Sequence, residues 1–417
     1  MRSLSLLFFC IISQQAYAAG FGLSEQNASG LGNAFAGAAA VAENASTIYA
    51  NPAGMVYLKG QQLSVAIHAI DPSSSFHNTS SVKAGAAALG NEGGDIGDLA
   101  LIPNIYYSQQ INPSLFMGIG VNAPFGLKTE YDSQWMGRFQ ALKSELKTIN
   151  INPAIAYQVN DKFAIGGGVS AMWAQAELTK AINIGSNNTV KVKGDDWGFG
   201  FNLGAIYQAT PDTRFGLAYR SEVRQKLDGT SSSTFHSVDT IPTLTLNTGT
   251  TADLTLPANL SISALSHLNS KWDIMADVTW TGWSKFQELK VVRDNGSILN
   301  NTTENWHDTM RYSLGASYQY NEKLKLRTGV AFDEEAIDDQ YRTARIPGND
   351  RTWLAFGASW QAFEHDNIDI GYAHLFIKDA SVNDSQNIPS KGLVNGNLVG
   401  QYQGQVDILS VQYTHQF

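Results

Sequence analysis

Residues 19–55 read AGFGLSEQNASGLGNAFAGAAAVAENASTIYANPAGM, and this stretch decides how the rest of the chain must fold. It is small, apolar and rich in glycine, it carries almost no charge, and it closes on Asn51-Pro52-Ala53. From there to the last residue, apolar and polar positions alternate. A segment this short cannot bury a core of its own, so it must pack against something larger. We expect residues 19–55, called the hatch below, to lie inside a barrel formed by residues 56–417 and to plug it.

The composition favours an outer-membrane β-barrel. Charged side chains make up 16% of the 417 residues, well below the roughly 25% of a soluble chain. The mean hydropathy is only −0.17, which is too low for a helical membrane protein. Low charge, 38 glycines and 11% aromatic residues suit a barrel whose apolar side chains alternate with polar ones. The net charge of −9 argues against a nucleic-acid partner.

The N-terminus has the pattern of a secretory signal peptide. Arg2 supplies the positive start, Leu4–Ile12 the apolar core, and Ala16-Tyr17-Ala18 the cleavage site. We therefore predict a signal peptide over residues 1–18 and a mature chain that begins at Ala19. The only cysteine, Cys10, lies in the removed segment, so no disulfide and no Cys-based metal site is expected. No metal or other cofactor is predicted.

Alternating segments follow the hatch with a regular rhythm. In residues 324–332 the apolar side chains share one face, and the opposite face carries Lys325 and Arg327. Such a segment fits a soluble sandwich equally well, so the connections must decide between the two. They alternate between short turns and long polar loops, and the count indicates about fourteen strands with both chain ends on the periplasmic side. Short turns are predicted at Ile111-Asn112-Pro113, Asn160-Asp161, Pro211-Asp212, Asn269-Ser270, Asn321-Glu322 and His365-Asp366. Long loops are predicted at Pro72–Asp98, Gly126–Ser144, Asn183–Gly194, Gly229–Thr250, Asp294–Glu304, Glu334–Asn349 and Asn383–Gly400.

Aromatic residues cluster where strands are expected to meet the membrane interface, and most are interpreted as girdle residues. They are Tyr106, Tyr107, Trp280, Trp283, Trp353, Trp360 and Tyr413. The terminal Phe417 is typical of barrels recognised by the outer-membrane assembly machinery, which we expect as a partner.

One loop differs from the others. Asn122-Ala-Pro-Phe-Gly-Leu127 breaks a strand, because Pro124 cannot donate to the sheet. The following stretch, Tyr131–Leu146, has helical spacing with one apolar face. That face either packs on the barrel rim or forms an outward-open groove that collects hydrophobic molecules. Arg138 is a candidate for holding a carboxylate, and a solvated role is the alternative. The groove candidates are Phe125, Leu127, Trp135, Met136, Phe139 and Leu142.

Taken in order, these motifs resemble the FadL-type outer-membrane transporters over essentially all of the mature chain. The resemblance is carried by the hatch ending in Asn51-Pro52-Ala53, the loop from Asn122 to Tyr131 and Trp135-Met-Gly-Arg138, and then by Leu256-Pro257-Ala258, Trp280-Thr-Gly-Trp283-Ser284-Lys-Phe286 and Arg345-Ile-Pro-Gly-Asn-Asp-Arg351. Gly348 departs from the pattern, since members commonly carry Asp there. This departure touches an outer loop and leaves the barrel interpretation intact.

The resemblance implies a fourteen-stranded barrel with an N-terminal hatch that carries long-chain fatty acids or other hydrophobic compounds inward across the outer membrane. Cargo is caught between outer loops, passes to a pocket in the barrel, contacts the hatch start, and leaves sideways into the bilayer at an inward kink of the third strand. The hatch start corresponds to Ala19, Gly20 and Phe21, and the hatch motif to Asn51, Pro52 and Ala53. The protein is expected to act as a monomer.

Physical chemistry supports a sheltered route independently. Exposing a methylene to water costs about 0.8 kcal/mol, so a long acyl chain loses roughly 10 kcal/mol or more in a watery pore. A wall opening leaves sheet edges unsatisfied in lipid, and an inward kink confines that defect. Gly118, Gly120 and Pro124 are where we expect the third strand to kink most cheaply, with close packing and a strand end as the alternative.

Other functions fit less well. An aromatic-hydrocarbon importer of the same family is the nearest alternative, and a buried Arg or Lys in the pocket would favour a fatty acid. A general porin predicts steady conductance, which a filled lumen opposes. An enzyme is not expected, since there is no G-x-S-x-G and the histidines are scattered. Energy-coupled receptors have about 22 strands, too many for this chain. The acidic stretch Asp333–Asp339 either binds divalent cations or is a solvated loop.

Overall fold

The computed structural model describes residues 20–183, 188–236, 243–385 and 396–417. Ala19, the predicted signal peptide and its cleavage site lie outside the described residues. The division at residues 18 and 55 stays a prediction.

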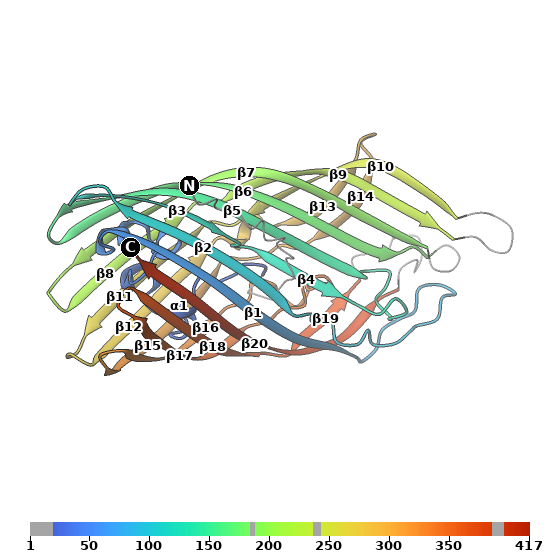
Figure 1. Ribbon diagram of the computed structural model, residues 1–417. Coiled ribbons are helices and arrows are strands. Elements are labelled where there is room, and N and C mark those ends of the chain that lie inside the picture. Colours follow the sequence, from blue (N-terminus) through green and yellow to red (C-terminus); the bar gives the residue numbers. More distant parts are fainter. Residues whose placement is uncertain (1–19, 184–187, 237–242, 386–395) are drawn as a thin grey trace, which may run out of the picture.

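The described residues form one closed antiparallel barrel of fourteen spanning strands, as predicted (Figure 1). The barrel closes where β1 pairs with β20, from Gln62 opposite Gln416 to Asn78 opposite Gly400. The spanning strands are β1 (Gln61–Asn78), β2 (Ala100–Gln110), β3 (Leu115–Asn122), β5 (Lys143–Asn160), β6 (Phe163–Ala181), β7 (Thr189–Gln208), β8 (Thr213–Arg220), β11 (Asn259–His267), β12 (Trp272–Thr281), β15 (Thr309–Asn321), β16 (Leu324–Asp333), β17 (Arg351–Phe363), β18 (Asp366–Ile377) and β20 (Leu398–Gln416).

Shorter strands carry the wall onward at one end of the barrel. They are β4 (Gly126–Glu130), β9 (Val223–Phe235), β10 (Leu244–Leu256), β13 (Glu288–Arg293), β14 (Ile298–Thr303) and β19 (Ala380–Asp384). All the predicted short turns fall between strands at the other end, on the left of Figure 1. Some predicted loop limits are wrong, because strands extend into those loops. β1 runs to Asn78, and β9 pairs with β10 inside the predicted loop Gly229–Thr250.

The outward faces of the strands are apolar, which is the reverse of a soluble sandwich. In β16, Leu326, Val330 and Phe332 are 40%, 47% and 42% exposed, whereas Arg327 points inward and is 6% exposed. This alternation places the apolar side chains toward lipid and the polar ones toward the lumen. Among the described residues, no helix is both long and apolar enough to cross a bilayer.

The prediction of girdle residues is wrong for three aromatic side chains. Tyr106, Trp283 and Trp353 are at most 2% exposed and lie in the interior. Tyr106 and Trp353 occupy inward positions of β2 and β17, and Trp283 begins η2 (Trp283–Lys285), a short 3-10 turn that leaves the wall after β12. Trp360 and Tyr413 point outward as predicted.

The described part of the hatch lies inside the lumen near the short-turn end, as the blue coils in Figure 1 show. Its elements contact opposite parts of the wall: α1 meets β17, β18 and β20, α2 meets β8 and β11, and η1 meets β5, β6 and β7. A segment with few large side chains is suited to this space because the wall surrounds it on all sides. The hatch elements are α1 (Ala28–Leu31), α2 (Ala38–Val41), α3 (Thr47–Ala50) and η1 (Pro52–Tyr57).

The predicted loop helix over Tyr131–Leu146 is wrong. Residues 131–142 form turns, and β5 begins at Lys143. The backbone N–H groups of Asp132 and Met136 donate to carbonyls of Gly93 and Asn91 on a neighbouring loop, in place of helical partners. The apolar spacing instead serves a stack in which the Trp135 ring lies 3.7 Å from that of Tyr131.

Candidate functional site

The wall is interrupted between β3 and β4. β3 pairs with β5 up to Asn122 opposite Asn150, and β4 resumes with Gly126 opposite Lys147, so three residues face two. This is a β-bulge, and it includes Pro124. On the other side, β2 pairs with β3 only along Ile105–Gln110. Within the described residues, Ala100–Asn104 pair with β1 but with no strand on the β4 side. The wall therefore has a lateral gap between β2 and β4.

The first described residues of the hatch lie in this gap. Leu23 N donates to Pro124 O at 2.8 Å, and Gly126 N donates to Phe21 O at 2.9 Å. Gly22 and Phe125 thus form an antiparallel bridge. The hatch therefore provides the backbone hydrogen-bond partners that β2 does not provide here. The bulge keeps these partners as long as residues 21–23 stay in place.

Gly118 and Gly120 do not form the kink. Both lie in the regularly paired part of β3, opposite Ser108 and Tyr106 of β2. A Cβ on Gly118 would lie 2.6 Å from Ile48 of the hatch, so glycine there allows the hatch to approach the wall. The predicted role of these two residues in the kink is wrong, and the close-packing alternative describes them.

Phe21 is enclosed by aromatic rings. The ring centroids of Trp283, Trp306, Phe286 and Phe125 lie 4.6, 5.5, 5.7 and 6.2 Å from its own. Gly20, with φ +59°, passes so close to Trp283 and Trp306 that a Cβ would clash with both. Sequence reasoning missed Trp306 entirely and assigned Trp283 to the girdle. The connection β14–β15 carries Trp306, and no periodic pattern marks it.

Asn51 fastens the hatch to the wall and is fully buried. Its Nδ2 donates to Ala39 O at 2.7 Å, and to Ala205 O and Leu217 O on β7 and β8 at 3.1 and 3.4 Å. Its Oδ1 accepts from Ala53 N at 3.1 Å and caps η1, where Pro52 takes the first helical position. The three motif residues therefore hold one another and the wall together.

Gln26 links the hatch to the bulge. Its Nε2 donates to Leu23 O at 3.1 Å and to Ala123 O at 3.3 Å. Its Oε1 accepts from the Tyr106 hydroxyl at 3.2 Å. Because Gln26 is 3% exposed, these bonds are sheltered from water and hold residues 21–26 against the broken strand. Nothing in the sequence pattern singled out this residue.

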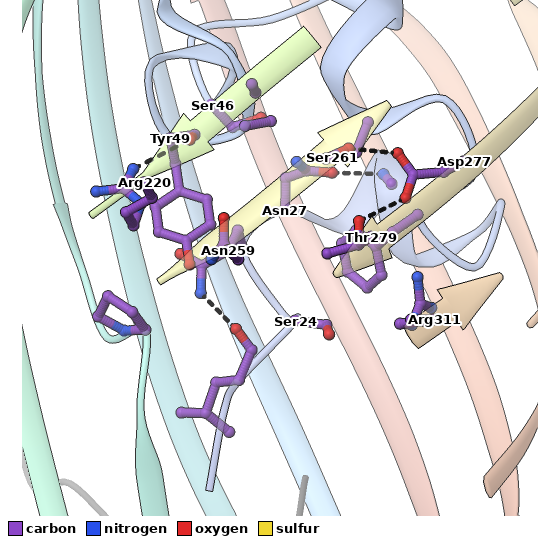
Figure 2. A pocket seen from close by; sticks show the side chains of 18 of the residues that line it. Ser24, Asn27, Ser46, Tyr49, Arg220, Asn259, Ser261, Asp277, Thr279 and Arg311 are labelled. Carbon is purple, nitrogen blue, oxygen red and sulfur yellow. Dashed lines mark hydrogen bonds between the residues drawn. The ribbon is translucent and has the colours of Figure 1, made fainter. Parts of the chain in front are cut away.

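A cavity of about 200 Å³, called the central cavity below, lies between the hatch and the wall formed by β8, β11, β12 and β15. Figure 2 shows polar side chains around it. Asp277 accepts from Ser261 at 2.6 Å and Thr279 at 2.7 Å, and also from Ser263. Apolar surface comes from Leu23, Phe35, Phe125 and Trp283, among others. The cavity is therefore amphipathic.

Two arginines line this cavity. Arg220 donates to Ser170, to Tyr49 O and to Asn152, and its guanidinium lies over the Tyr49 ring. Arg311 donates to Ser313 and to Ala34 O, and among the described residues its Nε has no partner. Asp333 stands opposite Arg311 on β16. Both guanidiniums are thus held by protein groups, and both belong to the lining of the cavity.

The predicted loop groove is closed in this structure. Phe125, Leu127 and Trp135 are 6%, 5% and 0% exposed and belong to one apolar cluster, against which Met136 and Leu142 pack. Phe139 is 5% exposed and lies under the guanidinium of Arg138 instead. An open groove in this region stays a prediction.

Arg138 binds its own loops. Its Nη1 donates to Leu89 O at 3.1 Å and Trp135 O at 2.9 Å, and its Nη2 donates to Ala88 O at 2.6 Å. Burial lowers the pKa of this guanidinium. These bonds hold the Arg138 side chain against its own loops, and its binding of a carboxylate stays a prediction. Across the part of the chain that the structure describes, no cluster of His, Cys, Asp or Glu is arranged to hold a metal ion.

Comparison with known proteins places these features in a family. A family model described as "Outer membrane protein transport protein (OMPP1/FadL/TodX)" matches residues 9–417. The chain is 35% identical over 416 residues to the 47 kDa outer membrane protein of Pasteurella multocida, covering 94% of each. It is 31% identical over 398 residues to the long-chain fatty acid transport protein of Escherichia coli O6:H1, covering 88% of each.

Solved structures agree on the fold. The crystal structure of a Pseudomonas aeruginosa FadL homologue superposes with a TM-score of 0.87 at 24% identity, covering 96% of this chain and 100% of that one. At that identity the likeness concerns the fold alone.

Proposed function

Because this chain belongs to the OMPP1/FadL/TodX family of outer-membrane transport proteins, we propose that it takes up long-chain fatty acids passively and releases them sideways into the bilayer. The protein lies in the outer membrane, and its family transports hydrophobic compounds. The choice of fatty acids and the lateral release are our proposal. It acts as a monomer, and the assembly machinery recognises its terminal Phe417.

The observation that carries lateral release is the pairing of residues 21–23 with the bulge. The gap between β2 and β4 is filled by a segment of the hatch and not by a neighbouring strand. When that segment leaves, the gap opens between lumen and lipid without breaking any strand–strand ladder. An oily molecule then passes from an apolar interior to an apolar bilayer, which avoids the cost of about 0.8 kcal/mol per methylene in water.

The size of the central cavity supports the same movement. Its volume of about 200 Å³ is below the roughly 300–1,000 Å³ of sites that hold a drug-sized ligand. A long acyl chain therefore needs hatch residues that line the cavity, such as Gly22 and Leu23, to move before it fits. Since those residues also fill the gap, cargo entry and gap opening are coupled through one segment.

The two cavity arginines support a fatty acid over an aromatic hydrocarbon. Both arginines line the cavity, and a carboxylate bound to the guanidinium of Arg311 gains a charge-assisted hydrogen bond from a donor of this group. Toluene and similar hydrocarbons have no group that uses this donor.

A disulfide across the bridge tests lateral release. Gly22 and Phe125 form a non-hydrogen-bonded antiparallel pair, whose Cα atoms are about 4.5 Å apart, within the roughly 4.4–6.8 Å that a disulfide spans. The double variant Gly22→Cys with Phe125→Cys has no other thiol once the signal peptide is removed. We expect oxidised protein in proteoliposomes to pass no labelled oleate, and reduction of the same sample to restore uptake. Equal uptake before and after reduction contradicts the proposal, and each single variant controls for loss of the native side chain.

A variant of Arg311 tests the cargo. Losing one charge-assisted hydrogen bond is expected to weaken binding by about ten- to a hundredfold. Arg311→Gln should lower oleate affinity by that factor and leave toluene uptake unchanged. If both fall together or neither changes, Arg311 does not select the carboxylate. Mass spectrometry of lipids that copurify with the folded barrel identifies the cargo directly.

A further inference from the structure

A second cavity lies beside the central one, on the short-turn side of the hatch. We call it the vestibule. It measures about 240 Å³, and Glu43 and Asn44 of the hatch line both cavities. A partition built from these two residues therefore separates them.

The lining of the vestibule differs from that of the central cavity. Charged and amide side chains dominate, and its exposed surface is mostly polar. A polar cavity this large holds several water molecules, since one occupies about 30 Å³. The other lining residues are Gln319, Glu322, Lys323, Lys325, Arg327, Ser359, Gln361, Asn367, Asp369 and Thr414.

An ionic cluster closes the partition. Glu43 Oε1 lies 2.9 Å from Arg327 Nη2, and Glu43 Oε2 lies 3.6 Å from Lys325 Nζ. Arg327 Nη2 also lies 3.6 Å from Asp369 Oδ1. Within the described residues, Glu43 is the only hatch residue that forms a salt bridge to the wall. The two cations and two anions balance, and the side chains of Arg327 and Asp369 are almost fully buried.

When cargo enters the central cavity, the water that it displaces needs a polar path out of the barrel. A molecule that enters the central cavity from the long-loop end displaces the water there, and the lateral gap opens toward hydrocarbon, where water is unfavourable. The vestibule is the adjacent polar space, and it faces the end with short turns, which is periplasmic in barrels of this kind. The Glu43–Asn44 partition lies where the two cavities meet.

We propose that this barrel has a second, axial route, from the central cavity through the vestibule to the periplasm, which passes water and small ions but not the hydrophobic cargo. The Glu43 salt bridge to Arg327 closes it. The purpose of this route rests on the proposed function. Its structural basis does not, since the two cavities and the ion pair exist whatever the cargo is. Its polar lining excludes an acyl chain for the same reason that it admits water.

Conductance across planar bilayers tests this route. Glu43→Gln keeps the shape of the side chain and removes its charge, and the open fraction is expected to rise about tenfold or more over the native protein. Glu25→Gln is the matched control, because Glu25 is the other hatch carboxylate and lines neither cavity. It should conduct as little as the native protein. Lys325→Gln, which weakens the longer contact, should give a smaller rise.

The outcomes separate clearly. Native-like conductance of folded Glu43→Gln and Lys325→Gln protein, with folding judged by heat-modifiable migration, overturns the axial route. An equal rise in Glu25→Gln also overturns it, because the hatch is then merely loosened. If Glu43→Gln does not fold, Lys325→Gln decides the question. Oleate uptake is measured separately on the native protein, so absent uptake with a selective rise in Glu43→Gln rejects the proposed cargo and keeps the axial route.

Discussion

Replacing Asn51 with alanine should release the hatch and leave the barrel intact. The side chain makes contacts of 2.7, 3.1 and 3.4 Å through Nδ2 and accepts from Ala53 N through Oδ1. Taking about 1 kcal/mol for each of the two shorter Nδ2 bonds and about 1 kcal/mol for the cap, the hatch loses roughly 3 kcal/mol. At 1.4 kcal/mol per factor of ten, its open population rises by about two orders of magnitude.

Hydrogen–deuterium exchange read by mass spectrometry measures this opening. Amides in residues 47–57 should lose about a hundredfold in protection, whereas those of β7 and β8 should keep theirs because the strand ladders do not depend on the hatch. Asn112→Ala is the matched control, since Asn112 also bonds backbone amides but lies in the exposed β2–β3 turn. Unchanged exchange in residues 47–57, or equal loss across β7 and β8, would refute the reasoning.

Three further changes give distinct readouts. Burial raises the pKa of the Glu25 carboxyl from 4.5 to about 7, with Arg311 and Arg351 opposing the increase and Asp333 adding to it. The closed hatch thus keeps a proton on Glu25 that the released hatch gives up, so the contribution of Glu25 to hatch stability is full below pH 4.5 and falls by roughly 3 kcal/mol as the pH rises through 7. Exchange of the hatch amides should show this trend and Glu25→Gln should abolish it; an opposite trend contradicts the assignment. Phe21→Ala removes a side chain that is 2% exposed and should lower the stability of the closed hatch by about 3–5 kcal/mol. Trp283 and Trp306 should then be exposed to water, and tryptophan fluorescence should shift to the red. An unchanged emission maximum argues against the aromatic enclosure. Arg138→Lys should leave residues 131–142 open to proteases, because one ammonium cannot replace the fork that binds three carbonyls, and protection equal to that of the native protein contradicts this.

The barrel was predictable because it rests on local patterns. Alternation in β16 and the turn residues between strands depend on neighbours in sequence, so the strand number and the position of the short turns were confirmed. Within a predicted strand, however, whether an aromatic side chain faces the lumen or the lipid depends on the strand register. Tyr106 and Trp353 were therefore assigned to the wrong face.

The site was less predictable because it is assembled from distant strands. Arg311, Asp277 and Arg220 meet at the central cavity only through barrel closure, and nothing near them in sequence marks them. The apolar spacing after Tyr131 indicated a helix, but backbone bonds to Asn91 and Gly93 replaced the helical ones. Residues 19–55 were the exception, because their composition alone required a host that encloses them.

The three-against-two bulge beside Pro124 also fixes how this wall tolerates changes in length. In β3 the even-numbered side chains face the lumen, as Asn122 does, and in β4 the odd-numbered ones do, as Leu127 and Thr129 do. Deleting a single residue at 123–125 would leave two residues facing two, so the alternation would run unbroken and Leu127 and Thr129 would still face the lumen. A single deletion at this point is therefore expected to keep the facing of β4 and to remove the bulge, so the one extra residue, more than residue identity, is what interrupts the wall here.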